Sequence, residues 1–195
     1  MAMKLVVLVA ALTVGCTPYL SAGLDTNTSV RGPVANMVTQ PAATARQETA
    51  PPVADTRSYS FAIGGAFGPR MGLEVGAHLH DVNGASFSLP SAMGVDPLSP
   101  RYLIGSTSID VRYRWLALKH LTSDLHMGPA TAILLDRGMG DYQFGNGIRG
   151  GLTIGLKLGA VSAFADIYET EMVFNDGPAK GVSGLTGVTL GILVR

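Results

Sequence analysis

The stretch RMGLEVGAHLHD at residues 70–81 alternates strictly between two kinds of side chain. Met71 and every second residue after it up to Leu79 are apolar, whereas glycine, glutamate and histidine occupy the positions between them. An alternation with period two predicts a β-strand whose two faces have different surroundings. The face that lies inside therefore decides between a soluble sheet and a barrel that sits in a membrane.

The same period recurs from residue 57 to the end of the chain. Two segments are less regular, one of them containing Pro129. The apolar faces extend over about nine to eleven residues, which is the length that a tilted strand needs to cross the hydrocarbon layer. The alternation predicts seven strands, at about 58–67, 70–80, 103–117, 121–135, 147–158, 161–173 and 183–194.

The connections between these strands alternate between short and long. If the long connections all lie at one end, strand 58–67 starts at that end, so an earlier segment must first bring the chain there. The alternatives left open are an eighth strand within 17–56, for which 34–40 is the best candidate, a short strand at 84–89, or a tail that reaches this end by another route. The short turns are 68–69, 118–120 and 159–160, and the long connections are 81–102, 136–146 and 174–182.

Composition favours the interpretation in which the apolar faces point outward. Charged residues make up 14% of the chain and hydrophobic residues 47%, whereas soluble domains carry roughly 25% charged residues. The other faces of the strands contain mainly Gly, Ala and Ser with scattered charges, which suits a narrow lumen filled by side chains. The 14 basic and 14 acidic residues cancel, so there is no electrostatic argument for nucleic acid as a partner.

This pattern resembles the small outer-membrane barrels of the OmpA/OmpX type. The resemblance covers residues 57–195 and is one of pattern. It implies an all-β fold, a closed antiparallel up-and-down β-barrel of about eight strands, which we expect to be preceded by a disordered linker. The rival interpretation is a soluble β-barrel or sandwich that buries its apolar face.

The N-terminus has the layout of an export signal, with Lys4 followed by an apolar run up to Val14. Residues 12–16, Leu-Thr-Val-Gly-Cys, resemble the lipobox of bacterial lipoproteins, although Thr13 stands where leucine is usual. The resemblance implies cleavage before Cys16 and acylation of this cysteine. An ordinary signal peptide is the alternative. The domains expected are a signal peptide at 1–15, a lipidated N-terminus and flexible linker at 16–56, and the barrel at 57–195.

An outward apolar face places a set of charged residues in the lumen, where charges must be paired to avoid a large desolvation cost. The near balance of sign in this set predicts a closed ion-pair network. A narrow pore gated by rearrangement of the pairs is the alternative. The lumen set is Glu74, His78, Asp110, Arg112, Arg114, Asp124, His126, Arg149, Lys157 and Asp166.

Two further groupings of chemically active residues are weaker signals. Glu74, His78 and His80 share one face and could bind zinc, but His80 adjoins a loop and is expected to be solvated, so we predict no metal and no cofactor. Ser123, Asp124 and His126 are adjacent, but alternate residues of a strand cannot all converge on one site, and no nucleophile motif surrounds the serine. The sequence therefore predicts a protein that is not an enzyme.

These observations predict a lipid-anchored β-barrel in the outer membrane of a Gram-negative bacterium. Its role would be structural, or one of surface interaction through the loops at 81–102 and 136–146. The expected partners are outer-membrane lipid and another envelope protein. The alternative function is a soluble lipid-anchored β-barrel, in the periplasm or at the cell surface, that binds an apolar ligand.

Overall fold

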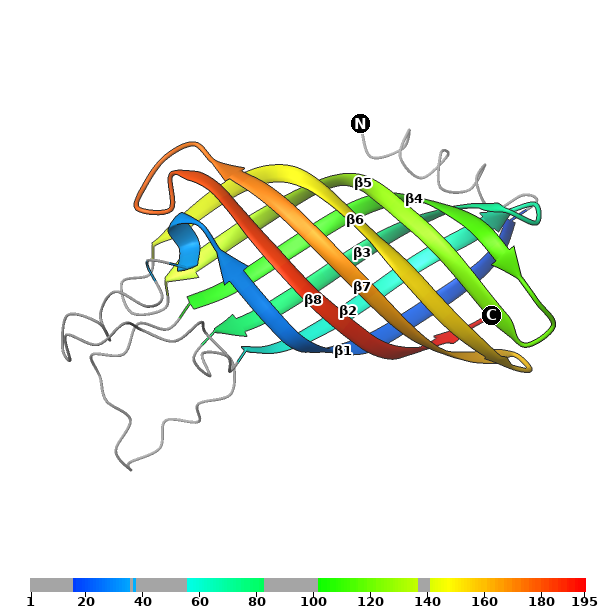
Figure 1. Cartoon of the computed structure of the whole chain (residues 1–195). Coiled ribbons are helices and arrows are strands. Elements are labelled where there is room, and N and C mark those ends of the chain that lie inside the picture. The colour runs from blue at the N-terminus through cyan, green and yellow to red at the C-terminus, as the bar shows by residue number, and fades with distance from the viewer. Residues whose placement is uncertain (1–15, 36, 38–55, 83–101, 137–140) are drawn as a thin grey trace, which may run out of the picture.

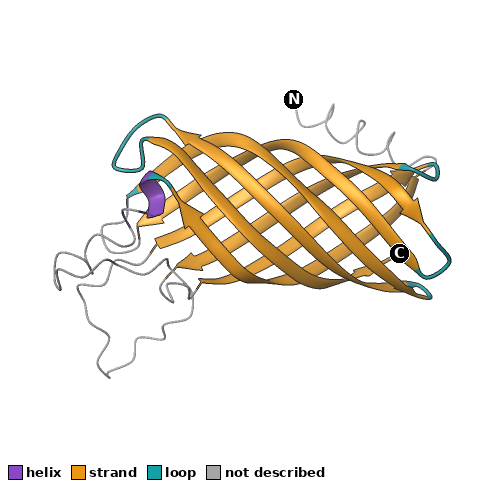
Figure 2. Cartoon of the chain, viewed as in Figure 1, coloured by secondary structure: helices purple, strands orange, loops and turns teal. Residues whose placement is uncertain are grey.

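The computed structural model describes residues 16–35, 37, 56–82, 102–136 and 141–195, and these form a closed eight-stranded β-barrel (Figures 1 and 2). Every strand pairs antiparallel with its neighbour in sequence, and β8 pairs with β1 to close the barrel. The predicted fold class is confirmed. The strands are β1 (Cys16–Arg31), β2 (Thr56–Phe67), β3 (Met71–Val82), β4 (Tyr102–Ala117), β5 (Leu121–Asp136), β6 (Tyr142–Leu158), β7 (Val161–Phe174) and β8 (Gly181–Val194).

The two ends of the barrel differ in the length of their connections (Figure 1). At the end that we call the turn end, β2–β3, β4–β5 and β6–β7 are joined by two or three residues each, and β1 begins and β8 finishes here. Gly68 and Gly159 occupy these turns with φ of 71° and 77°, a left-handed conformation that glycine adopts without steric cost. The opposite end, which we call the loop end, carries the longer connections.

The seven predicted strands are confirmed, but β6 begins at Tyr142, so residues 142–146 of the connection predicted at 136–146 belong to a strand. The interpretation of 16–56 as a linker is wrong for its first part. Cys16–Arg31 forms β1, which runs from the turn end to the loop end and brings the chain to the start of β2. The eighth strand therefore lies in the expected region but not at its best candidate, because Val34 sits in a short helical turn. Residues 38–40 and the other candidate at 84–89 lie outside the described residues.

β1 escaped prediction because its alternation is short and is interrupted. Leu20 and Leu24 face outward, but the register with β8 shifts between Thr26 and Ser29. Such a bulge changes the side on which the following residues lie.

Among the described residues, no helix has the length and apolar character needed to cross a membrane.

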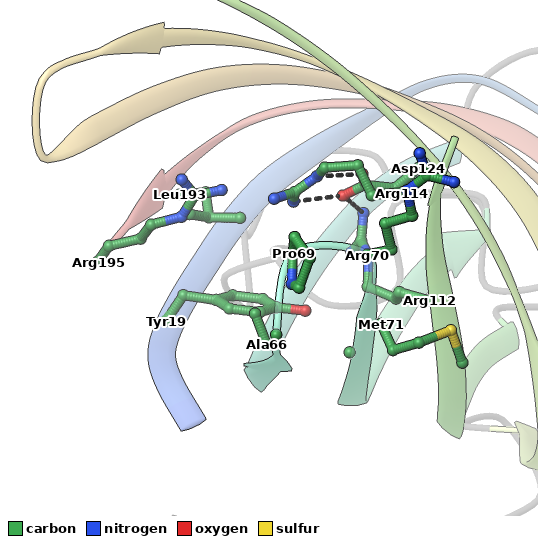
Figure 3. Close-up of a pocket in the computed structure, with 12 residues that line it drawn as sticks. Tyr19, Ala66, Pro69, Arg70, Met71, Arg112, Arg114, Asp124, Leu193 and Arg195 are labelled. Carbon is green, nitrogen blue, oxygen red and sulfur yellow. Dashed lines mark hydrogen bonds and ion pairs between the residues drawn. The ribbon is translucent and has the colours of Figure 1, made fainter. Parts of the chain in front are cut away.

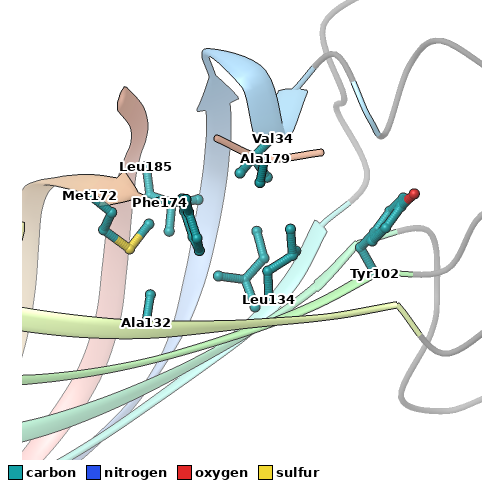
Figure 4. Close-up of a cluster of buried hydrophobic side chains, with 9 residues drawn as sticks. Val34, Tyr102, Ala132, Leu134, Met172, Phe174, Ala179 and Leu185 are labelled. Carbon is teal, nitrogen blue, oxygen red and sulfur yellow. The ribbon is translucent and has the colours of Figure 1, made fainter. Parts of the chain in front are cut away.

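The outer face of the barrel wall is apolar, and the middle of its inner face is polar. Outward side chains are large and apolar, with Phe61 61% and Ile109 50% exposed. Inward side chains in the middle of the barrel are polar or charged and buried, as Asp110, His126 and Arg149 are. An apolar cluster closes the loop end of the interior (Figure 4); it comprises Val34, Tyr102, Ile104, Ala132, Leu134, Met172, Phe174, Ala179 and Leu185.

Candidate functional site

The middle of the interior holds a buried cluster of charges from four consecutive strands. Arg149 on β6 donates to Asp166 on β7 at 2.9 Å and lies 3.6 Å from Asp110 on β4. His126 on β5 lies 2.8 Å from Asp166 and 3.5 Å from Asp110. One guanidinium and one imidazole thus face the same two carboxylates. We call Asp110, His126, Arg149 and Asp166 the central cluster.

A second group connects the central cluster to β1. The Asp25 carboxylate accepts hydrogen bonds from the hydroxyls of Tyr168, at 2.9 Å, and Thr189. The Nδ1 atoms of His78 and His80 each lie 3.9 Å from Asp25 Oδ2. Arg149 links the two groups, because it donates to Nε2 of His78 and its guanidinium lies 4.6 Å from the centre of the Tyr168 ring.

A third group lies nearer the turn end (Figure 3). Glu74 accepts from Arg112 at 2.5 Å and from the Tyr19 hydroxyl at 2.9 Å. Arg114 holds Asp124 with two hydrogen bonds, of 2.7 and 3.0 Å. This fork geometry is the strongest arrangement available to an arginine and a carboxylate. Arg112 also lies 3.8 Å from Asp124 and donates to the Thr153 hydroxyl at 2.6 Å. The Thr153 hydroxyl in turn donates to Asp166, so this group is connected to the central cluster.

The structure brings together all the lumen residues named from the sequence except Lys157. Each of the others takes part in at least one of the three groups, whereas Lys157 has no ion pair with any residue that the structure describes. Sequence reasoning missed Asp25, because β1 was taken for a linker, and Tyr19 for the same reason. It also missed Tyr168, although Tyr168 has the same parity as Asp166 on β7.

The expectation that His80 is solvated is wrong. His80 is only 1% exposed, and its Nδ1 lies 2.8 Å from the hydroxyl of Ser58. The strand continues past His80 to Val82, so the histidine lies within the wall and not beside a loop. Glu74 is engaged by Tyr19 and Arg112 and not by the histidines. The described residues contain no group of three His, Cys, Asp or Glu side chains placed to hold a metal ion.

The adjacent residues Ser123, Asp124 and His126 do not form a catalytic relay. Ser123 donates to the carbonyl oxygen of Thr153 at 3.3 Å, and Asp124 is held by Arg114. His126 is directed at the carboxylates of the central cluster instead. The serine therefore has no base beside it, which nucleophilic catalysis requires.

The space left between these side chains is small. A hollow of about 30 Å³ lies among Glu74, His78, Arg112, Arg149 and Asp166. A single water needs ~10–15 Å³ on this measure, so the hollow has room for about two waters. Apolar ligands occupy pockets of roughly 300–1,000 Å³, and this polar hollow is far smaller.

A closed barrel with a polar interior and an apolar exterior has the architecture of a transmembrane β-barrel. No protein-family model matches the chain, and no curated protein matches it. Among solved structures it is similar to Neisserial surface protein A (NspA), with 12% identity, a TM-score of 0.59, and coverage of 93% of this chain and 99% of that one.

Two further structures are similar over nearly their whole length. Ail, the attachment invasion locus protein of Yersinia pestis, in complex with the heparin analogue sucrose octasulfate, matches with 9% identity, a TM-score of 0.54 and coverage of 93% and 99%. A major outer membrane protein from Thermus thermophilus matches with 12% identity, a TM-score of 0.52 and coverage of 92% and 99%. Because these identities are low, the similarity shows the eight-stranded barrel fold alone.

Proposed function

We propose that the chain spans an outer membrane as a non-enzymatic β-barrel with a structural or surface-interaction role. The observation that carries this proposal is the reversed polarity of the wall, with exposed Phe61, Ile63 and Ile109 outside and buried Asp110 and Arg149 inside. Water on the outside would leave a continuous apolar belt unburied, which soluble proteins avoid. Hydrocarbon on the outside removes that cost.

The similar structures support the surface-interaction part of the proposal. They include one protein whose name is that of a surface protein and one that is named the attachment invasion locus protein. The longer connections of this chain gather at one end of the barrel. We propose that the partners are outer-membrane lipid around the belt and another envelope protein at the loop end. No cofactor enters the proposal.

We also propose that the lumen is plugged by its ion pairs. The three charged groups are linked through Arg149 and Thr153 and leave hollows of about 30 Å³. A charge buried without a partner costs several kcal/mol, so separating these pairs is unfavourable. The rival interpretation is a gated pore. Recordings from the purified protein in planar lipid bilayers should show no steady conductance, and frequent openings of the unmodified protein would favour the pore.

For the N-terminus we propose cleavage before Cys16 and lipidation of this residue. Cys16 is the first residue of β1 and pairs with Phe67 at the turn end, so acyl chains on it would enter the leaflet on that side. Two or three acyl chains give a stable anchor. Mass spectrometry of the N-terminal peptide should find Cys16 acylated, whereas an unmodified thiol would favour an ordinary signal peptide.

The alternative of a soluble, lipid-anchored barrel can be separated from the proposal by a Cys16→Ala variant with a working signal peptide. A membrane-spanning barrel should stay with the outer-membrane fraction after a carbonate wash and change its gel migration on heating. Release of the variant into solution would instead support a soluble barrel held only by its anchor. The small, charged hollows of the interior speak against an apolar ligand there.

A further inference from the structure

The turn end of the interior opens into a hollow whose charged lining is mostly arginine (Figure 3). The hollow measures about 30 Å³, room for about two oxygen-sized atoms, since a water takes ~10–15 Å³ on this measure. Its apolar lining comes partly from the β2–β3 turn. The side chains that can form hydrogen bonds in it are Tyr19, Arg70, Arg112, Arg114, Asp124 and Arg195.

Two of the four arginines are held in place by the protein. Arg112 is fixed by Glu74 and Arg114 by Asp124. A ligand that contacts them loses little additional side-chain entropy, because these guanidiniums are already ordered.

The other two arginines lack such partners. Arg70 donates to the Tyr113 hydroxyl at 3.4 Å, and neither Arg70 nor Arg195 forms an ion pair with another residue that the structure describes. Their backbones are nevertheless tied down, since the Arg70 carbonyl accepts from the Arg114 amide at 2.7 Å and the Arg195 amide donates to the Ala160 carbonyl at 3.1 Å.

Guanidiniums outnumber carboxylates around this hollow. The lining has four guanidiniums against the single carboxylate of Asp124, and Glu74 lies behind Arg112. The pKa of Arg195 is lowered below its ordinary value, mainly by partial shielding from water and to a smaller extent by repulsion from Arg114. The hollow therefore has an excess of positive charge that the described residues do not neutralise.

We propose that this arginine-lined hollow is a binding site for a phosphate group, on the side of the membrane where the turn end lies. Guanidinium groups bind phosphate through paired, charge-assisted hydrogen bonds. Two arginines with ion-pair partners and two without any among the described residues surround one hollow. This arrangement suits a phosphate better than a carboxylate, because a phosphate has more oxygens that can accept from several guanidiniums at once. The phosphate can come from a phospholipid headgroup of the adjacent leaflet or from free phosphate in the aqueous phase.

Calorimetric titration of the folded barrel with inorganic phosphate tests this proposal. The measurement uses a phosphate-free, non-ionic detergent at constant ionic strength, so it does not depend on the proposed membrane location. We expect saturable binding in the millimolar range. The double variant Arg70→Gln/Arg195→Gln should lose affinity by roughly tenfold or more, because it removes two charged donors to the phosphate. Both side chains lack ion pairs within the described residues, so the variant should fold, which heat-modifiable gel migration would verify.

The matched control is Lys119→Gln/Lys180→Gln, which removes the same charge at exposed positions outside the hollow. It should bind phosphate as the unmodified protein does. Equal weakening in both double variants, or the absence of saturable binding, would overturn the proposal. Phosphate binding that is present in the phosphate-free detergent and lost in phospholipid nanodiscs would assign the site to headgroups, and unchanged binding in the nanodiscs would assign it to free phosphate.

Discussion

Arg149 is the residue on which the interior network converges. Its guanidinium contacts Asp166, approaches Asp110, donates to His78 and lies over the Tyr168 ring. Among the described residues, removing it leaves His126 as the remaining ion-pair partner of the buried Asp110 and Asp166 carboxylates. A single side chain thus connects polar groups on β3, β4 and β7.

We therefore expect Arg149→Met to destabilise the folded barrel by about 3–5 kcal/mol, the usual cost of leaving a buried charge without its partner. Urea titration of folding into lipid vesicles would measure the change. The control is Arg31→Met, since Arg31 pairs with Glu169 and Glu171 at the exposed surface, where such pairs contribute roughly 0–1 kcal/mol. Equal effects of the two substitutions would contradict the proposed ion-pair plug.

Tyr168 provides a milder test at the same scale. Tyr168→Phe removes the hydroxyl that donates to Asp25, and Thr189 remains as a donor to the same carboxylate. We expect a loss of about 1–3 kcal/mol, the cost of an unsatisfied buried acceptor. Tyr142→Phe, at an exposed tyrosine, should change stability by much less in the same titration.

At the scale of the strand, the contact between β4 and β5 depends on a glycine. A Cβ atom on Gly128 would lie 1.8 Å from the carbonyl oxygen of Ile109 on β4. Backbone cannot move away as a flexible side chain can, so any larger residue must separate the strands.

Gly128→Ala should therefore destabilise the barrel by about 1–3 kcal/mol through overpacking. Gly105→Ala, on β4, is the control, because a Cβ there meets nothing within 4 Å. The two variants can be compared by the temperature at which heating converts the gel band of the folded barrel into that of the unfolded chain. A smaller effect at Gly128 than at Gly105 would show that the strands separate at little cost.

The strands were predictable where alternation is long, and less so where it is short or broken. Pro129 made 121–135 look irregular, yet β5 accommodates it at an exposed position opposite Ile148. β1 escaped because its outward Leu20 and Leu24 precede a bulge. Parity along a strand places Asp110 and Arg149 inside, but their pairing depends on register between strands, which alternation does not specify.

At the scale of the whole molecule, the apolar belt distinguishes a membrane protein from a soluble one. We expect Ile109→Arg to weaken folding into lipid vesicles by about 2–4 kcal/mol, because Ile109 lies near the middle of β4 and faces outward. Leu118→Arg, in the β4–β5 turn at the rim, should cost about 0–1 kcal/mol. For a soluble barrel both substitutions would be neutral in the same measurement.

The pairing of β1 with β8 also constrains how the molecule forms. Leu20 meets Val194, so contacts that complete the wall join segments separated by almost the entire chain. Pairings of such long range form slowly, since the intervening chain must be ordered first. Until β8 arrives, β1 and β7 each present an unpaired edge that can associate with other chains. Assembly is therefore expected to require protection of these edges during transit, and a chain interrupted before β8 should aggregate instead of forming a smaller barrel.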